Sequence, residues 1–267
     1  MIDIHPPAHG AMTRRDFFVH LGIVVLGILI AIGLEQAVEA VHHRVQRNDL
    51  IRQMRTESQH NLSIFETDRR IVIVQIAWYR NCLSALIHAT PHQNSIDVTL
   101  PLRQPTPPPI TPEQAAWAIA TTNGTVALLS DNLAEVYQRL DLEAEVANYA
   151  QTKVNDSAVE MAAVSVRLGL ALDPGATLHL SPADRDLLLQ ALSRVEADWS
   201  QVLLRDAFWQ GAADAVAHNV SSRDDIVPYM RQAVRSTQQA EIQAGIPVLA
   251  SERAAFQLTT TAQVHIP

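Results

Sequence analysis

Two short motifs, Glu39-x-x-His42 and Glu57-x-x-His60, hold residue types that are well suited to binding a metal ion. Helical bundles with di-metal carboxylate centres use two Glu-x-x-His motifs and two further glutamates, all directed into the bundle. Here both motifs lie on what reads as one helical run, about five turns and roughly 27 Å apart. They cannot hold one metal cluster within a chain, and a site between chains would need a partner helix at each level. We therefore interpret Glu39, His42, Glu57 and His60 as exposed polar residues that are only weak metal candidates, and we predict no cofactor.

Two further carboxylate–histidine pairs have the i, i+4 spacing of one helix face: Glu39 with His43, and Asp214 with His218. A histidine beside a carboxylate titrates near physiological pH, so the polar strip that starts at Glu35 could sense protons. Asp214 and His218 could act as a general-base pair or contact a metal. Most such pairs are weak surface contacts on a helix, and this is the interpretation that we favour for both.

The composition excludes several function classes. The 267-residue chain has a formal net charge of -8, and Lys153 is its only lysine, so it lacks the basic footprint of a nucleic-acid-binding protein. Cys82 is the only cysteine, which excludes an internal disulfide framework, and its apolar neighbours predict a buried structural thiol. The sequence contains no phosphate-binding loop, nucleophile elbow, zincin motif or kinase signature. We predict no catalytic residue and no enzymatic activity.

Residues 17–34 contain no Asp, Glu, Lys or Arg and are rich in Ile, Leu and Val. At 1.5 Å per residue they span roughly 27 Å, which is enough to cross the hydrocarbon core of a bilayer. Residues 13–18 (TRRDFF) resemble a twin-arginine export signal, which would be cleaved. Export signals have a shorter apolar core and a small-residue cleavage site, and the best site here, 38–40 (VEA), falls in continuing helix. We therefore expect an uncleaved anchor; a cleaved signal and a buried helix of a soluble protein stay as alternatives.

The charges that flank the span predict its orientation. Arg14 and Arg15 precede it directly, whereas its far side opens with Glu35 and Glu39. The positive-inside rule therefore predicts a cytoplasmic N-terminus and an exported C-terminal domain. A wider count weakens this prediction, because the far side also carries four arginines: Arg44, Arg47, Arg52 and Arg55.

Small residues inside the span would let another membrane helix approach closely. They are Gly22, Gly27, Ala31 and Gly33, of which Gly27 and Ala31 have the small-xxx-small spacing. We therefore predict the lipid bilayer as one partner, and a protein partner or a second copy of the chain as another.

Several stretches resemble a group of uncharacterised bacterial single-pass membrane proteins. They are IHPP at 4–7, DFFVHLGIVVLGILIAIGLEQAVE at 16–39 and HHR at 42–44, which match that group's Asp-Phe-x-x-His opening and its Gly-Leu-Glu type close. The stretch 116–140 (AWAIATTNGTVALLSDNLAEVYQRL) is similar to a segment of related anchored helical proteins. The resemblance implies a helical domain anchored in the bacterial inner membrane, and it implies no particular activity. Arg14-Arg15 departs from the group.

The fold class that we predict is all-α. After a short tail at 1–16 and the span at 17–34, we expect a stalk helix or helices over 35–89, because no Pro or Gly occurs there. The Pro-rich segment 90–112 holds an alternating pattern at Ile96, Val98, Leu100 and Leu102 that predicts a short strand. A helical bundle of five to seven helices is expected over 113–253 together with the stalk. The tail at 254–267 also reads as strand-like, and we expect these two strands to pair as a small two-stranded β element.

Helix boundaries in the bundle follow from capping chemistry. Residues 111–114 (TPEQ) form a capping box with Pro at the first helical position, and 181–184 (SPAD) have a similar start. Asn123-Gly124 predicts a break between two helices, and 173–175 (DPG) predicts the end of the helical region 131–172.

These patterns together favour a membrane-anchored helical protein without catalytic activity: an interaction, scaffold or sensor-input module whose bundle lies in the periplasm. Two alternatives stay open. One is a twin-arginine-exported soluble helical protein, and the other is a membrane-tethered metal-binding protein that uses the histidine and carboxylate strip.

Overall fold

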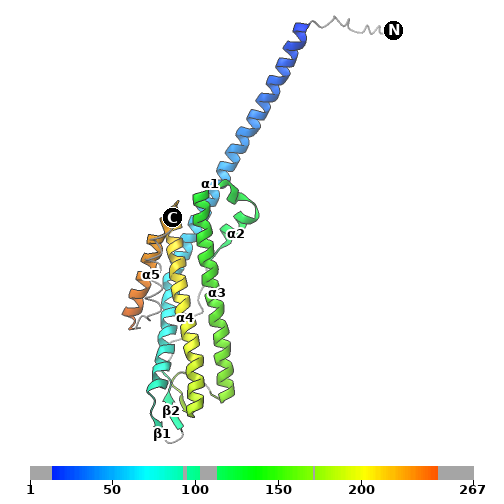
Figure 1. Ribbon diagram of the computed structural model, residues 1–267. Helices are drawn as coiled ribbons and strands as arrows, with labels where there is room; N and C mark the ends of the chain where they lie inside the picture. The colour runs from blue at the N-terminus through cyan, green and yellow to red at the C-terminus, as the bar shows by residue number, and fades with distance from the viewer. Residues whose placement is uncertain (1–13, 93–94, 103–112, 171, 246–267) are drawn as a thin grey trace, which may run out of the picture. The chain divides into compact units, whose positions relative to one another are not determined.

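A computed structural model describes residues 14–92, 95–102, 113–170 and 172–245 of the chain, and these residues are mostly helical (Figure 1). The helices and strands follow in this order: α1 (Arg14–His88), β1 (Pro91–His92), β2 (Ser95–Thr99), α2 (Ala115–Thr122), the 3-10 helix η1 (Thr125–Leu128), α3 (Asp131–Leu168), β3 (Thr177–Leu180), α4 (Pro182–Ala217) and α5 (Ile226–Gln243). The chain divides into two compact units, Met1–Asp49 and Leu50–Pro267.

In the first unit, the described residues belong to the N-terminal part of α1. This part contains an 18-residue window with a mean hydropathy of 2.7, none of which is buried. By length and composition, α1 is therefore able to cross a membrane. Its apolar side chains are exposed on every side of the helix, from Phe17 to Leu34, and an all-round apolar surface suits lipid rather than water.

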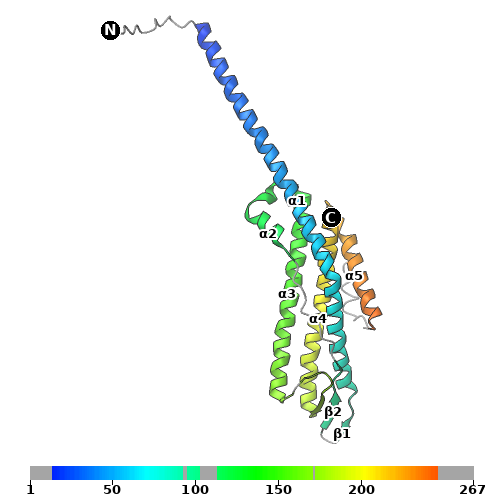
Figure 2. The same cartoon turned by 180° about the vertical axis from the view of Figure 1, so that it is seen from behind.

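In the second unit, the remainder of α1 packs with α3, α4 and α5 into a bundle (Figure 2). This part of α1 turns apolar side chains to the core, where Met54 and Phe65 are buried. Phe65 meets Trp209 of α4 with ring centroids 6.3 Å apart, while Arg80 reaches Glu196. Residue numbers rise along α1 as they fall along α4, so the two helices are antiparallel. The predicted all-α class is confirmed, and the described residues contain five α-helices.

A small antiparallel sheet of strand order β1-β2-β3 closes one end of the bundle. The predicted strand is present as β2, in which Ile96 and Val98 are buried and alternate with exposed residues. Its partner on one side is β3, where Ile96 lies opposite Leu180 and Val98 opposite Leu178. The expected partner at 254–267 lies outside the described residues. The predicted strand region also reaches Leu102, which is highly exposed and lies beyond the end of β2.

Local capping chemistry accounts for the start of α4 and the end of α2. Ser181 caps α4 by accepting a hydrogen bond from the Asp184 N–H at 3.2 Å, with Pro182 at the first position, as predicted. Asn123 ends α2, and Gly124 follows with φ 78°, a left-handed conformation that favours glycine. The predicted start of α2 was wrong: the helix begins at Ala115 and its N-cap is Gln114, which makes no side-chain cap. Residues 111 and 112 lie outside the described residues.

Candidate functional site

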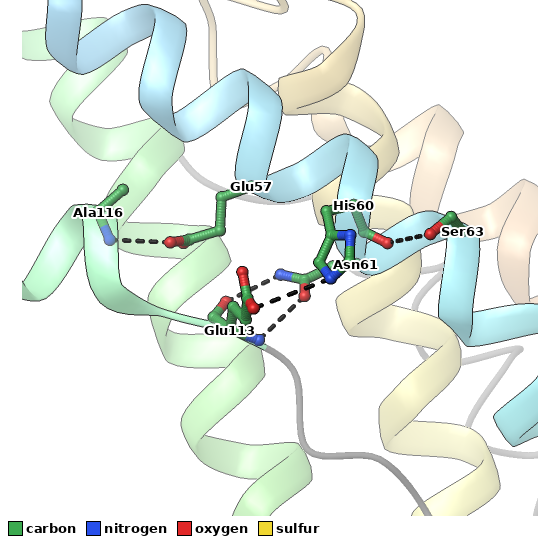
Figure 3. A network of polar contacts seen from close by, with 6 residues as sticks. All are labelled: Glu57, His60, Asn61, Ser63, Glu113 and Ala116. Carbon is green, nitrogen blue, oxygen red and sulfur yellow. Dashed lines mark hydrogen bonds and ion pairs between the residues drawn. The ribbon is translucent and has the colours of Figure 1, made fainter.

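The second Glu-x-x-His motif lies on α1 where that helix faces the start of α2 (Figure 3). Glu57 accepts a hydrogen bond from the Ala116 N–H at 2.9 Å. One turn along α1, Asn61 makes two hydrogen bonds with the backbone of Glu113: its Nδ2 donates to the carbonyl oxygen at 2.8 Å, and its Oδ1 accepts from the N–H at 2.9 Å. Glu57 and Asn61 therefore clasp the N-terminus of α2, where backbone N–H groups have no partner within their own helix.

The charge of Glu57 suits this position. A carboxylate is stabilised at a helix N-terminus, because the helix dipole and the free N–H groups both favour negative charge there. Burial and the nearby charge of Glu113 nevertheless raise the pKa of Glu57, while the N–H groups of Ala116 and Ala115 oppose that rise. His60 lies 3.8 Å from Glu113, and both side chains are exposed, so their attraction is weak. The motif here is an N-terminal cap supplied by a distant helix.

The first motif does not gather further ligands. Glu39 and His42 are exposed on α1 in the first unit, and the Nε2 atom of His43 lies 3.8 Å from the Glu39 carboxylate. Across the ranges that the structure describes, no three His, Cys, Asp or Glu side chains come together in a way that could hold a metal ion. Glu39 and His42 belong to the first unit and Glu57 and His60 to the second, and their weak candidacy as metal ligands stays a prediction.

The residues singled out in the span are accessible. A Cβ atom added at Gly22, Gly27 or Gly33 would meet nothing within 4 Å. Ala31 is exposed as well, and Arg14 and Arg15 are exposed at the first turn of α1. These positions are open to a neighbouring helix or to lipid, and their roles in packing and orientation stay predictions.

Sequence reasoning missed a carboxyl pair inside the bundle. Asp68 of α1 is 7% exposed and lies one turn beyond Phe65, and Asp206 of α4 lies one turn before Trp209. Because Phe65 and Trp209 are in contact across antiparallel helices, the two aspartates occupy the next level of the same interface. Burial, and then the charge of Asp68, raise the pKa of Asp206 to about 8. Only the i, i+3 spacing of each aspartate from an aromatic core residue could have hinted at this pair.

A second polar contact ties the same two helices further along. The Nε of Arg80 donates to Glu196 at 2.6 Å, and its Nη2 donates to Ser200 at 3.2 Å. Ser200 in turn donates to Glu196 at 3.1 Å. Arg80 and Glu196 are 15% and 10% exposed, so the pair is largely removed from water. A group held in this way fixes helix register and is not positioned to meet a substrate.

The surface of the bundle has a hollow with a volume of about 460 Å³. It is lined by charged and polar side chains of α3 and by Arg223: Glu135, Gln138, Arg139, Asp141 and Glu145 are the polar ones on α3. Burial and the charge of Glu145 raise the pKa of Asp141, while a hydrogen bond with Trp117 opposes the rise. The hollow is open to solvent and mixes both signs of charge, which is typical of a surface contact region rather than an enclosed catalytic pocket.

The pair predicted from i, i+4 spacing at the end of α4 is present. His218 Nδ1 lies 3.1 Å from Asp214, with His218 largely exposed. The same nitrogen is 2.9 Å from the Asp214 carbonyl oxygen, so the histidine also closes the end of its own helix.

Comparison of the chain with protein-family models, with curated proteins and with solved structures returns no match.

Proposed function

We propose that this chain is a single-pass protein of the bacterial inner membrane whose exported helical bundle acts as an interaction or sensor-input module without catalysis. One observation carries the proposal: the apolar span and the first helix of the bundle core are parts of one unbroken helix, α1. The same element that would cross the bilayer also supplies Met54, Phe65 and Ile76 to the core.

The continuity of α1 favours an anchor over a cleaved signal. The best cleavage site, 38–40, lies within α1 and is followed by helix up to His88. Signal peptides end their apolar region with a short segment that leads into the cleavage site. The fully exposed apolar window in residues 17–34 would need lipid around it for its whole length.

The placement of the polar groups favours interaction over catalysis. Glu57 and Asn61 are engaged in capping α2, and Arg80 with Glu196 and Ser200 ties α1 to α4. The orientation that we propose, with the N-terminus in the cytoplasm and the bundle in the periplasm, rests on Arg14 and Arg15. The partner would be a protein or a second copy of the chain.

Two measurements test this proposal. Alkaline extraction of membranes should leave the full-length chain in the pellet, and N-terminal sequencing of the mature protein should begin near residue 1. A soluble chain that begins at Val41 would contradict the anchor and favour twin-arginine export. Purification from detergent-solubilised membranes should recover either a stoichiometric protein partner or a homo-oligomer. Recovery of a tightly held metal ion would favour the tethered metal protein instead.

A further inference from the structure

A stripe of exposed valines continues along α1 past the end of the apolar span. Val38, Val41 and Val45 are 69%, 62% and 52% exposed, and they follow Leu34 at spacings of four, three and four residues. This alternation of three and four residues is the heptad pattern that places side chains on one seam of a helix. The seam lies wholly within the first unit, Met1–Asp49.

Lipid cannot cover the outer part of this seam. The headgroup region adds only about 5–8 Å on each side of the hydrocarbon core. Counted from Leu34, the last residue of the apolar run, Val41 lies about 10 Å and Val45 about 16 Å further along the helix. Both therefore stand in water if residues 17–34 span the core, and no described residue of the chain covers them. An apolar row that stays exposed in water typically marks an interaction surface.

The residue types on the seam match a two-stranded parallel coiled coil. With Val38 and Val45 at position a, Leu34 and Val41 fall at position d. β-branched residues at a with Leu at d favour two parallel strands. The same phase runs back into the span through Val24 and Ala31 at a and Gly27 at d, so the pattern covers three heptads.

The flanking charges are complementary in the same arrangement. In a parallel pair, a residue at position g meets the residue at e of the next heptad on the other chain. Arg44 occupies g, and Asp49, five residues later, occupies e. Two copies in register would thus place Arg44 of each chain beside Asp49 of the other. Two copies anchored in one membrane with the same orientation are parallel by necessity, and their confinement raises their effective concentration.

We propose that two copies of this chain pair in parallel along Leu34, Val38, Val41 and Val45, which forms a coiled coil directly outside the membrane. The proposal rests on the membrane anchoring proposed above and deepens it, because it names the second copy as the partner.

Cysteine cross-linking of the full-length chain in native membranes tests the pairing. Single cysteines are introduced at Val38, Val41 and Val45 on the seam, and at Glu39, Ala40 and His43 on the other faces as matched controls. The unsubstituted chain gives the background, because its only cysteine, Cys82, is buried. With copper-phenanthroline as the oxidant, two thiols lose their protons and two electrons to form each disulfide. We expect several-fold more covalent dimer from the seam positions than from the controls, and equal yields on all faces would overturn the proposal.

A charge exchange tests the register. In the Val41→Cys chain, Arg44→Glu places two acidic residues together across the seam and should reduce the dimer yield. Adding Asp49→Arg should restore it, because positions five residues apart on one helix do not face each other and the rescue must come from the second chain. If the chain with both Arg44→Glu and Asp49→Arg gives no more cross-linked dimer than the chain with Arg44→Glu alone, the parallel register is contradicted. Alkaline extraction of the same samples separates the two failures: a chain that leaves the membrane contradicts the anchor, and a retained chain without seam cross-links contradicts only the dimer.

Discussion

At the scale of single residues, the groups most able to do chemistry serve the bundle itself. Glu57 and Asn61 hold the start of α2, and Asp68 and Asp206 lie together within the α1–α4 interface. Glu57 belongs to a motif that we interpret from the sequence as exposed polar residues and only weak metal candidates, whereas Asn61, Asp68 and Asp206 belong to no motif singled out from the sequence. Capping and carboxyl pairing both depend on which helix faces which, and a linear motif does not report that.

The Asp206 carboxyl predicts a pH-dependent stability. Its pKa is raised to about 8 in the folded chain against an ordinary value of about 3.9, so the folded state holds this proton more tightly than the unfolded state. The stabilisation from the proton is complete below about pH 4 and is lost as the pH rises through about 8. The side chain of Asp206→Asn stays neutral at every pH. We therefore expect the free energy of unfolding of this variant to fall less between about pH 4 and about pH 8, and the variant to be more stable than the unsubstituted chain at pH 9.

Urea unfolding of the detergent-solubilised chain at pH 5, 7 and 9 checks the prediction. Asp186→Asn is the matched control, because Asp186 is exposed on the same helix beside Arg185. If the free energy of unfolding of both variants falls with pH as it does in the unsubstituted chain, Asp206 is not the group that loses the proton.

The clasp on α2 predicts a local loss of stability. Glu57→Ala removes the acceptor of the Ala116 N–H, and loss of an N-terminal cap typically costs about 1 kcal/mol. Glu57→Gln keeps an acceptor oxygen and should lose less. Hydrogen exchange at the Ala115 and Ala116 amides should therefore quicken most in the alanine variant. Gln59→Ala, an exposed change in the same turn of α1, should leave the exchange unaltered, and an equal effect there would contradict the clasp.

At the scale of elements, α4 and α5 approach each other closely at Gly211. A Cβ atom built there would lie 2.3 Å from Cα and 2.6 Å from N of Met230, both of them backbone atoms. The glycine is therefore required by the close approach of two helices. This contact explains why a residue that weakens an isolated helix occurs inside α4, six residues before its end at Ala217.

Gly211→Ala should separate α5 from α4 and destabilise the bundle by about 1–3 kcal/mol, the usual cost of overpacking. In an uncrowded helix the same change would stabilise the protein by about 1 kcal/mol through helix propensity. The sign of the change in stability therefore decides whether the helix is crowded at this position. Gly211→Val should be worse than the alanine variant. Thermal unfolding followed by circular dichroism measures both, and a gain in stability for alanine would show that the two helices have room to spare.

Local chemistry made part of the fold predictable from the sequence. The absence of Pro and Gly over 35–89 predicted one or more helices there, and α1 covers that range up to His88. Ser181-Pro182 predicted the start of α4. The start of α2 was misplaced because its cap comes from Glu57, 59 positions earlier in the chain. Strand β3 was missed because four residues are too few to show a period. The Asp68–Asp206 pair required the register of α1 against α4, which no local pattern reports.

At the scale of the whole chain, the function proposed here depends on how Arg14 and Arg15 are used. In a twin-arginine signal, the export machinery would recognise the two arginine side chains themselves. Under the positive-inside rule, only their positive charge matters. The two roles can be separated by substitutions that keep the charge and change the residue type.

We expect Arg14→Lys with Arg15→Lys to leave export and membrane retention unchanged, because lysine serves the positive-inside rule as well as arginine does. Arg14→Gln with Arg15→Gln removes the charge and should turn part of the population around, since Arg44, Arg47, Arg52 and Arg55 on the far side would then dominate. A C-terminal reporter that is active only outside the cytoplasm measures the exported fraction, and alkaline extraction measures retention. Loss of export in the lysine variant would instead identify a twin-arginine signal, because only recognition of the guanidinium groups distinguishes the two side chains.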